Sequence, residues 1–266
     1  MNKISIIFLL VFFILLILLK PYIKESFSNK TIDKNKTIDK NIIIDKIYVI
    51  NLDESSQRLK DITLYLKGEN MDFERVSGVV GKKLDKKKLI AENIVENKKL
   101  KKGEIGCALS HIKIWNKAVK ENQNILVLED DVIIKKNFWE NFNKIQSQIP
   151  ADFDIVYLGG SNIYGTKISE NIIRPKSNKK KDTTNSGTYA MLINKKSIHK
   201  LLKMSKPLTH AIDMQIKKDF DKFKVYYVYQ PLITHNNNIS SDRRLNSNQK
   251  PLTRWFKKTQ SKINIV

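Results

Sequence analysis

The chain has few cysteines, arginines and glycine-rich segments, and each shortage excludes a class of protein. Cys107 is the single cysteine among 266 residues, so an internal disulfide is impossible. Nine glycines are present, but none forms the glycine-rich turn of a dinucleotide-binding fold, which argues against NAD as a cofactor. The chain is therefore neither a disulfide scaffold nor a typical dinucleotide-dependent enzyme.

Arginine is scarce although the chain is strongly basic. The formal net charge is +22, yet only six of the 49 basic residues are arginine. Specific recognition of nucleic acids relies on the forked guanidinium group, which lysine does not replace. Lysine is spread along the whole chain beside many asparagines and isoleucines, as expected of a solvated surface. We therefore expect no nucleic-acid partner, although attraction to anionic membranes stays open.

The longest apolar run lies close to the N-terminus and lacks a small-residue cleavage site after it. Residues 4–19 would span about 24 Å as a helix, against a hydrocarbon core of about 30 Å. Because flanking lysines can snorkel and early-secretory membranes are thin, residues 1–22 are expected to be a membrane anchor rather than a cleaved signal peptide. Lysines on both sides of the run leave its orientation open.

A short repeat follows this expected anchor. The hexapeptide NKTIDK begins at Asn29 and again at Asn35, and NIIIDK follows from Asn41. Units this short cannot bury an apolar face, so residues 23–45 are expected to form a polar stalk. The two Asn-x-Thr triplets suit a lumenal or extracytoplasmic location, but such triplets also arise by chance in an asparagine-rich chain.

Apolar runs and helical periodicity alternate after residue 46 and predict an α/β domain over residues 46–252. Strands that alternate with helices imply a mostly parallel, doubly wound sheet. A polar lysine-rich loop is expected over 176–185 and a peripheral tail over 253–266. Strands are expected at 47–50, 73–80, 125–128, 154–158, 188–193 and 224–229, and helices at about 56–67, 85–96, 103–121, 137–148 and 196–204.

Three consecutive acids, Glu129, Asp130 and Asp131, close the most apolar of these strands. In parallel sheets ligands bind beyond the carboxyl ends of the strands, and a divalent cation would relieve the repulsion among the carboxylates. The two-residue period of a strand would aim Glu129 and Asp131 to one side, where both could bind a hard metal through oxygen. The alternative is a polar strand exit that caps the next helix or pairs with Lys135 and Lys136.

Two further segments carry candidate residues. The first strand ends near Asp53 and Arg58, which either contact a phosphate or serve as a helix cap and a surface ion pair. Small residues around Gly106 let a ligand or backbone approach the start of the next long helix. Ser110 and His111 follow one turn later, where they either donate to an anion or act as structural hydrogen-bonding groups.

Four ordered segments resemble glycosyltransferase family 25 over roughly residues 46 to 242. They read IYVINLDESSQR from Ile47, GEIGCALSHIKIW from Gly103, ILVLEDDV from Ile125 and SGTYAMLINKKSIHKLL from Ser186. The family includes bacterial lipooligosaccharide and animal procollagen galactosyltransferases. The resemblance implies a glycosyltransferase-A-type fold, a nucleotide-sugar donor and an acidic motif served by Mn²⁺ or Mg²⁺. The lysine-rich loop and the asparagine-rich end of the domain do not match the family.

The resemblance also assigns roles to residues of this chain. Asp213 falls on a recurrent acidic position after the Tyr-Ala segment and is the candidate base; its alternative is a helix-surface acid paired with Lys217. Independently of the resemblance, the position of His235 after the last expected strand makes it a candidate metal or phosphate ligand, or a turn histidine without a functional role. The donor-side residues are Asn51, Asp53, Arg58, Gly106, Ser110, His111 and Asp130; the metal ligands are Glu129, Asp131 and His235; the catalytic residues are Asp131 and Asp213.

The resulting hypothesis is metal-assisted, inverting transfer of a hexose, galactose or glucose, from a UDP-sugar to a hydroxyl group. The acceptor is a free glycan, a lipid-linked glycan or hydroxylysine in protein. The first alternative is a membrane-tethered binding protein of the same fold that has lost catalysis. The second is a basic nucleic-acid-binding protein, which the shortage of arginine disfavours.

Overall fold

A computed structural model describes residues 44–160, 162–176, 186–236 and 264–265. The expected anchor lies outside these residues, as do most of the expected stalk, lysine-rich loop and tail. Among the residues that are described, no helix is long and apolar enough to cross a membrane.

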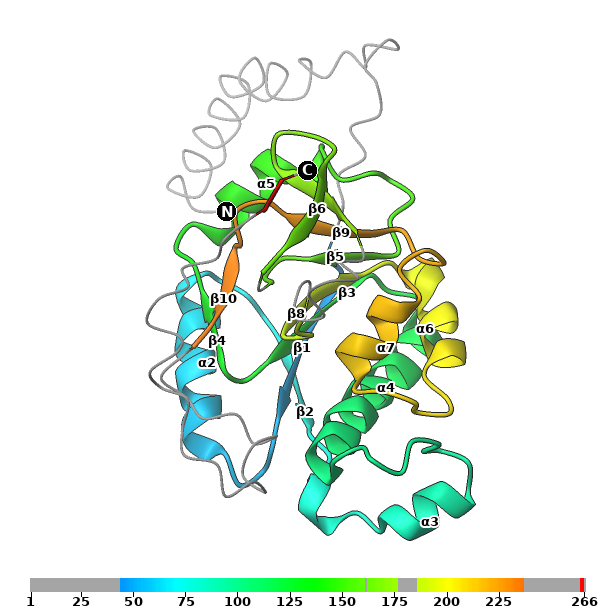
Figure 1. The fold of residues 1–266 in the computed structure, drawn as a ribbon. Coiled ribbons are helices and arrows are strands. Elements are labelled where there is room, and N and C mark those ends of the chain that lie inside the picture. The colour runs from blue at the N-terminus through cyan, green and yellow to red at the C-terminus, as the bar shows by residue number, and fades with distance from the viewer. Residues whose placement is uncertain (1–43, 161, 177–185, 237–263, 266) are drawn as a thin grey trace, which may run out of the picture. The chain divides into compact units, whose positions relative to one another are not determined.

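A nine-stranded sheet forms the centre of the described fold (Figure 1). Its strands are β1 (Lys46–Asn51), β2 (Glu74–Ser77), β3 (Ile125–Glu129), β5 (Ile155–Tyr157), β6 (Tyr164–Lys167), β7 (Ile172–Pro175), β8 (Ala190–Ile193), β9 (Val225–Val228) and β11 (Asn264–Ile265). They are ordered β11-β6-β7-β9-β5-β8-β3-β1-β2. Seven share one direction, while β7 and β8 run antiparallel to both neighbours. The mostly parallel sheet is confirmed, but its two reversed strands were not expected.

Helices cover both faces of this sheet, as a doubly wound fold requires. Alternation along the strands supplies the two apolar layers: Tyr48 and Val127 face one helix layer, while Val49 and Leu126 face the other. The first layer contains α4 (Lys102–Glu121), α6 (Ile198–Met204) and α7 (Ile212–Lys218), and the second contains α2 (Ser56–Gly68) and α5 (Phe138–Gln146).

One edge of the sheet collects the carboxyl ends of three parallel strands. Asn51 ends β1 opposite Ser77 of β2, and Ile50 is in register with Glu129 of β3. Next to them, the reversed β8 begins at this edge, where the Glu129 amide donates to the Tyr189 carbonyl at 3.1 Å. The polar residues that follow these strands therefore meet at one place.

A separate antiparallel pair lies beside this edge. Strand β4 (Val132–Ile134) pairs with β10 (Ile233–His235), and His235 stands opposite Val132. Neither strand was expected from the sequence. The pairing brings His235 to Val132, the residue that follows Asp131.

The expected elements are mostly confirmed, with shorter ends. The second strand covers only 74–77 of the expected 73–80, and the helix expected over 85–96 is α3 (Lys86–Ala91), capped by the Asp85 carboxylate. Besides β4 and β10, the unexpected elements are β6, β7, β11, α7 and two short 3₁₀ turns, Gly81–Lys83 and Lys195–Ser197. Strand β11 falls within the residues expected to form a peripheral tail and pairs with β6.

Candidate active site

The acidic triplet does not continue its strand. Strand β3 ends at Glu129, and Asp130 and Asp131 form a turn before β4. The two-residue period that was expected to align Glu129 with Asp131 is therefore interrupted, and this part of the geometric prediction was wrong. Each of the three carboxylates has its own partners.

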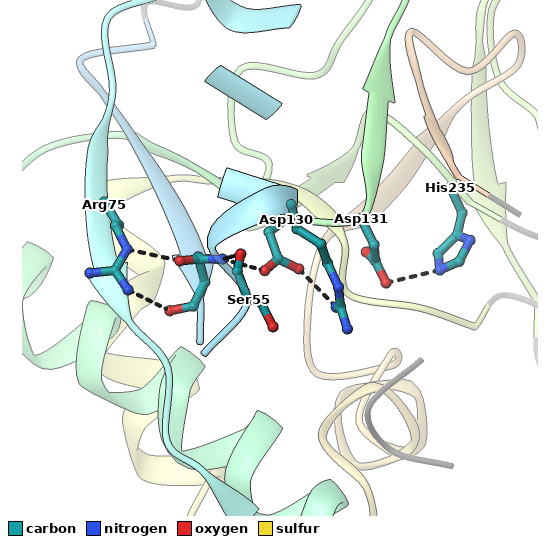
Figure 2. Close-up of polar contacts among 7 residues, drawn as sticks. Ser55, Arg75, Asp130, Asp131 and His235 are labelled. Atoms are coloured by element: carbon teal, nitrogen blue, oxygen red, sulfur yellow. Dashed lines mark hydrogen bonds and ion pairs between the residues drawn. The ribbon is translucent and has the colours of Figure 1, made fainter. Parts of the chain in front are cut away.

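Asp130 is held by two polar side chains from the first strand and helix (Figure 2). Asn51 donates through Nδ2 to Asp130 Oδ2 at 2.6 Å, and Arg58 Nη1 lies 3.2 Å from Oδ1. Burial raises the pKa of Asp130 to about 6, although the Asn51 hydrogen bond and the Arg58 charge oppose the rise. The structure thus brings together Asn51, Arg58 and Asp130, all of which the sequence proposed.

Arg75 extends this chain of contacts and was missed from the sequence. Its Nε donates to Asn51 Oδ1 at 2.9 Å, and its guanidinium forms an ion pair with Asp53. Hydrogen bonds from Arg75 and then from Ser77 hold the pKa of Asp53 below its usual range. A signal existed, since Arg75 is one of six arginines and lies in an expected strand.

Asp131 and His235 form a second contact, which Figure 2 shows on the other side of Asp130. Asp131 Oδ2 lies 3.1 Å from His235 Nε2, and the Asn236 amide donates to the Asp131 carbonyl at 2.7 Å. Asp131 Oδ1 is buried and has no hydrogen-bond partner within the part of the chain that the structure describes. An oxygen without a partner beside an imidazole suits a divalent cation such as Mn²⁺. Metal binding here stays a prediction.

Glu129 faces α4, as its place in the strand alternation requires. Thr188 Oγ1 donates to Glu129 Oε1 at 2.8 Å, and His111 Nε2 lies 3.5 Å from the same oxygen. The neighbouring Gly187 amide donates to Asp213 Oδ2 at 3.3 Å. The segment 187–188 therefore contacts both Glu129 and the candidate base Asp213; the sequence placed it in a family-like block but gave neither residue a role in the site.

Gly106 and Ser110 hold α4 against the loop that follows β2. The Val79 amide donates to Ser110 Oγ at 2.8 Å, and that hydroxyl donates to the Gly106 carbonyl at 2.7 Å. A Cβ on Gly106 would lie 2.6 Å from the Val79 carbonyl oxygen. The close approach predicted at Gly106 is thus made by backbone, and a donor-binding role of Gly106, Ser110 and His111 stays a prediction.

Comparison with known proteins agrees with these segments. A family model described as "Glycosyltransferase family 25 (LPS biosynthesis protein)" matches residues 44–216, more than half of the chain. A protein named as a glycosyltransferase in Haemophilus influenzae is 29% identical over 189 residues, 69% of this chain and 66% of that protein.

Two larger proteins match a smaller part. "Procollagen lysyl hydroxylase and glycosyltransferase" of Acanthamoeba polyphaga mimivirus is 34% identical over 150 residues, 48% of this chain and 17% of that protein. "Procollagen galactosyltransferase 2" of Homo sapiens is 30% identical over 126 residues, 42% of this chain and 20% of that protein. The match thus covers under two thirds of the Haemophilus protein and a fifth or less of these two. The family model nevertheless spans most of the folded domain, and the chain belongs to glycosyltransferase family 25.

Proposed function

We propose that this protein is a metal-dependent glycosyltransferase that moves a hexose, galactose or glucose, from a UDP-sugar to a hydroxyl acceptor with inversion at the anomeric carbon. The observation that carries the proposal is the pair of Asp131 and His235 beside the Asp130–Asn51–Arg58 chain, at the carboxyl ends of parallel strands. Family membership supports the class of reaction. The galactosyltransferase name of one relative supports the hexose.

The two aspartates of the acidic turn have different tasks in binding the donor. Asp131 and His235 would hold Mn²⁺ or Mg²⁺, which when bound offsets the negative charge that develops on the departing diphosphate. Arg58 adds positive charge next to the turn, and Asp130 fixes its position. At the ends of β1 and β2, Asn51 bonds Asp130, and Arg75 bonds both Asn51 and Asp53. The nucleoside would bind beside these strand ends.

Asp213 is the proposed general base. It lies in the first turn of α7, and Gly187 donates to its Oδ2. In a single displacement, the acceptor oxygen attacks the anomeric carbon, the bond to the diphosphate breaks, and Asp213 takes the acceptor proton. This needs no covalent intermediate on the enzyme, in keeping with inversion.

Asp131→Asn is the most direct test of this function. The carboxamide keeps the size of the side chain but removes its charge, so transfer from radiolabelled UDP-galactose and UDP-glucose with Mn²⁺ should fall by about 100-fold or more. Glu140→Gln, at an exposed acid on α5, is the control and should transfer at the wild-type rate.

Two results would contradict the proposal. Full activity of Asp131→Asn would remove this carboxylate from the mechanism. Tight binding of UDP-sugars by the wild type without any turnover would instead favour a binding protein that has lost catalysis.

We further propose that residues 1–22 anchor the enzyme to a membrane, with the catalytic domain on the lumenal or extracytoplasmic side. The apolar run 4–19 supports this. Leu10→Arg with Leu15→Arg should release the protein from alkaline-washed membranes, because each central arginine costs about 3 kcal/mol in a membrane helix. Wild-type protein that washes off equally well would contradict an anchor.

A further inference from the structure

His111 is a fully buried histidine in α4. Its side chain is 0% exposed, and neither Nδ1 nor Nε2 has a hydrogen-bond partner within the described ranges of the chain. Buried imidazole nitrogens are normally paired, since burial removes the water that would otherwise bind them. The ring therefore requires an explanation beyond packing against Trp115, 6.0 Å away between centroids.

Two other ligand-type side chains lie next to this ring. Cys107 precedes His111 by four residues on α4, so both project from the same face of the helix. Glu129 reaches that face from the end of β3 because it shares the alternation of Ile125 and Val127, which pack in the layer of α4. One ligand atom from each of Cys107, His111 and Glu129 lies within 4.8 Å of the others. Among the described residues, this is the one group of three or more such side chains that lies so close.

The donor set indicates which cation fits. A thiolate sulfur, an imidazole nitrogen and a carboxylate oxygen are the ligands of borderline-soft Zn²⁺, whereas Mn²⁺ and Mg²⁺ prefer oxygen. Tetrahedral coordination would draw the three atoms, now within 4.8 Å of one another, to separations of about 3.5 Å. Three protein ligands would leave a fourth position for water.

We propose that Cys107, His111 and Glu129 form a site for a transition-metal cation of the zinc type, separate from the hard-metal pair of Asp131 and His235. Binding releases the thiol proton of Cys107 to solvent and gives His111 a partner for one ring nitrogen. It also joins α4 to the strand end that begins the acidic turn. Neither Cys107 nor the zinc takes part in the proposed transfer reaction, so metal binding here is tested separately from transfer.

The single cysteine makes the site unusually easy to test. The full-length chain, freed of metal with a chelator, is titrated with Co²⁺, whose thiolate complexes absorb by charge transfer in the near ultraviolet. We expect that band to saturate at about one Co²⁺ per chain and to vanish when Zn²⁺ is added. Because Cys107 is the single thiol of the chain, the band reports this residue alone.

Matched variants separate the two metal sites. Cys107→Ser should abolish the cobalt band and weaken Zn²⁺ binding at least tenfold, as measured by competition with a chromophoric chelator. Asp131→Asn should keep both the band and the Zn²⁺ affinity while it loses transfer. Glu129→Gln should weaken Zn²⁺ binding without abolishing the band, because the thiolate is still present.

Protection of the thiol gives a second readout that needs no substitution. Saturating Zn²⁺ should slow the reaction of Cys107 with a thiol reagent at least tenfold and raise the Tm by about 5 °C. Absence of the cobalt band from the wild type, or equal Zn²⁺ affinity of wild type and Cys107→Ser, would overturn the proposal.

Discussion

Asn51 is a neutral residue that links two charged side chains, Asp130 and Arg75, through hydrogen bonds. The residue is 1% exposed, and its amide donates both to Asp130 and to the Ser55 carbonyl, at 3.0 Å for the latter. Its carbonyl oxygen accepts from Arg75. A neutral side chain with a donor and an acceptor is needed here, because a carboxylate would repel Asp130 and an ammonium would repel Arg75.

Asn51→Ala should therefore destabilise the protein and weaken binding of the UDP-sugar together. The substitution removes the hydrogen bonds that Asn51 makes with Asp130 Oδ2 and Arg75 Nε, so the free energy of unfolding should fall by about 2 kcal/mol. Urea denaturation measures this loss. Gln57→Ala removes an exposed hydrogen bond to Asp61 and should change the free energy by less than about 0.5 kcal/mol. Equal stability of the two variants would show that Asn51 has no such role.

The chemistry of single residues was easier to predict than their partners. The sequence proposed both Asp131 and His235, yet they are 104 positions apart and their contact depends on the pairing of β4 with β10. Each of these strands has three residues, too few for a periodic signal. The separation of Glu129 from Asp131 was missed for a related reason, since the turn between β3 and β4 interrupts the strand period.

At the scale of elements, long helices and buried strands were predictable and the direction of strands was not. Helix α4 and strand β3 appear almost at their expected limits because their apolar patterns are long and continuous. Strand β8 is apolar throughout, and this pattern is the same for a parallel and an antiparallel strand. Its antiparallel pairing with β3 and β5 therefore could not be predicted from the sequence. Its direction nevertheless decides that Thr188 reaches Glu129.

Because α4 packs closely on the loop after β2, alanine substitutions at two helical glycines should change the free energy of unfolding in opposite directions. Gly106→Ala places a methyl group against the Val79 carbonyl, so the free energy of unfolding should fall by about 1–3 kcal/mol despite the better helix propensity of alanine. Gly68→Ala lies in the last turn of α2, where no described atom beyond its own helix and chain neighbours comes within 4 Å of the added Cβ, and should raise the free energy of unfolding by up to about 1 kcal/mol. Thermal and urea unfolding of both variants measure the difference, and a stabilised Gly106→Ala would contradict the close approach.

Across the whole domain, the two edges of the sheet carry different kinds of charged contact. The candidate site lies at the carboxyl ends of β1, β2 and β3, where burial raises the pKa of Asp130. At the opposite edge, Asp154 precedes β5 and is 4% exposed. It accepts from the Lys224 amide at 2.8 Å, from Lys200 Nζ at 2.9 Å and from the Ser197 hydroxyl. These contacts tie the starts of β5 and β9 to the segment after β8, which is a stabilising role.

Asp154→Asn should consequently reduce stability in a pH-dependent way and leave transfer unchanged. Burial raises the pKa of Asp154, but the hydrogen bonds from Ser197 and Lys224 and the charge of Lys200 outweigh it and hold the pKa below its usual value. A carboxyl group whose folded-state pKa lies below its unfolded value, about 3.9, stabilises the fold above that value and loses this contribution as the pH falls through the folded-state pKa. The variant should therefore be less stable than the wild type by about 2 kcal/mol at pH 7, and the difference should shrink steadily below about pH 4.

Urea unfolding at pH 7, 5, 4 and 3 measures this difference in stability. Asp152→Asn, at an exposed ion pair with Lys224, is the control and should differ from the wild type by less than about 1 kcal/mol throughout. A difference between wild type and Asp154→Asn that stays constant down to pH 3 would show that the carboxylate charge is not what joins these elements.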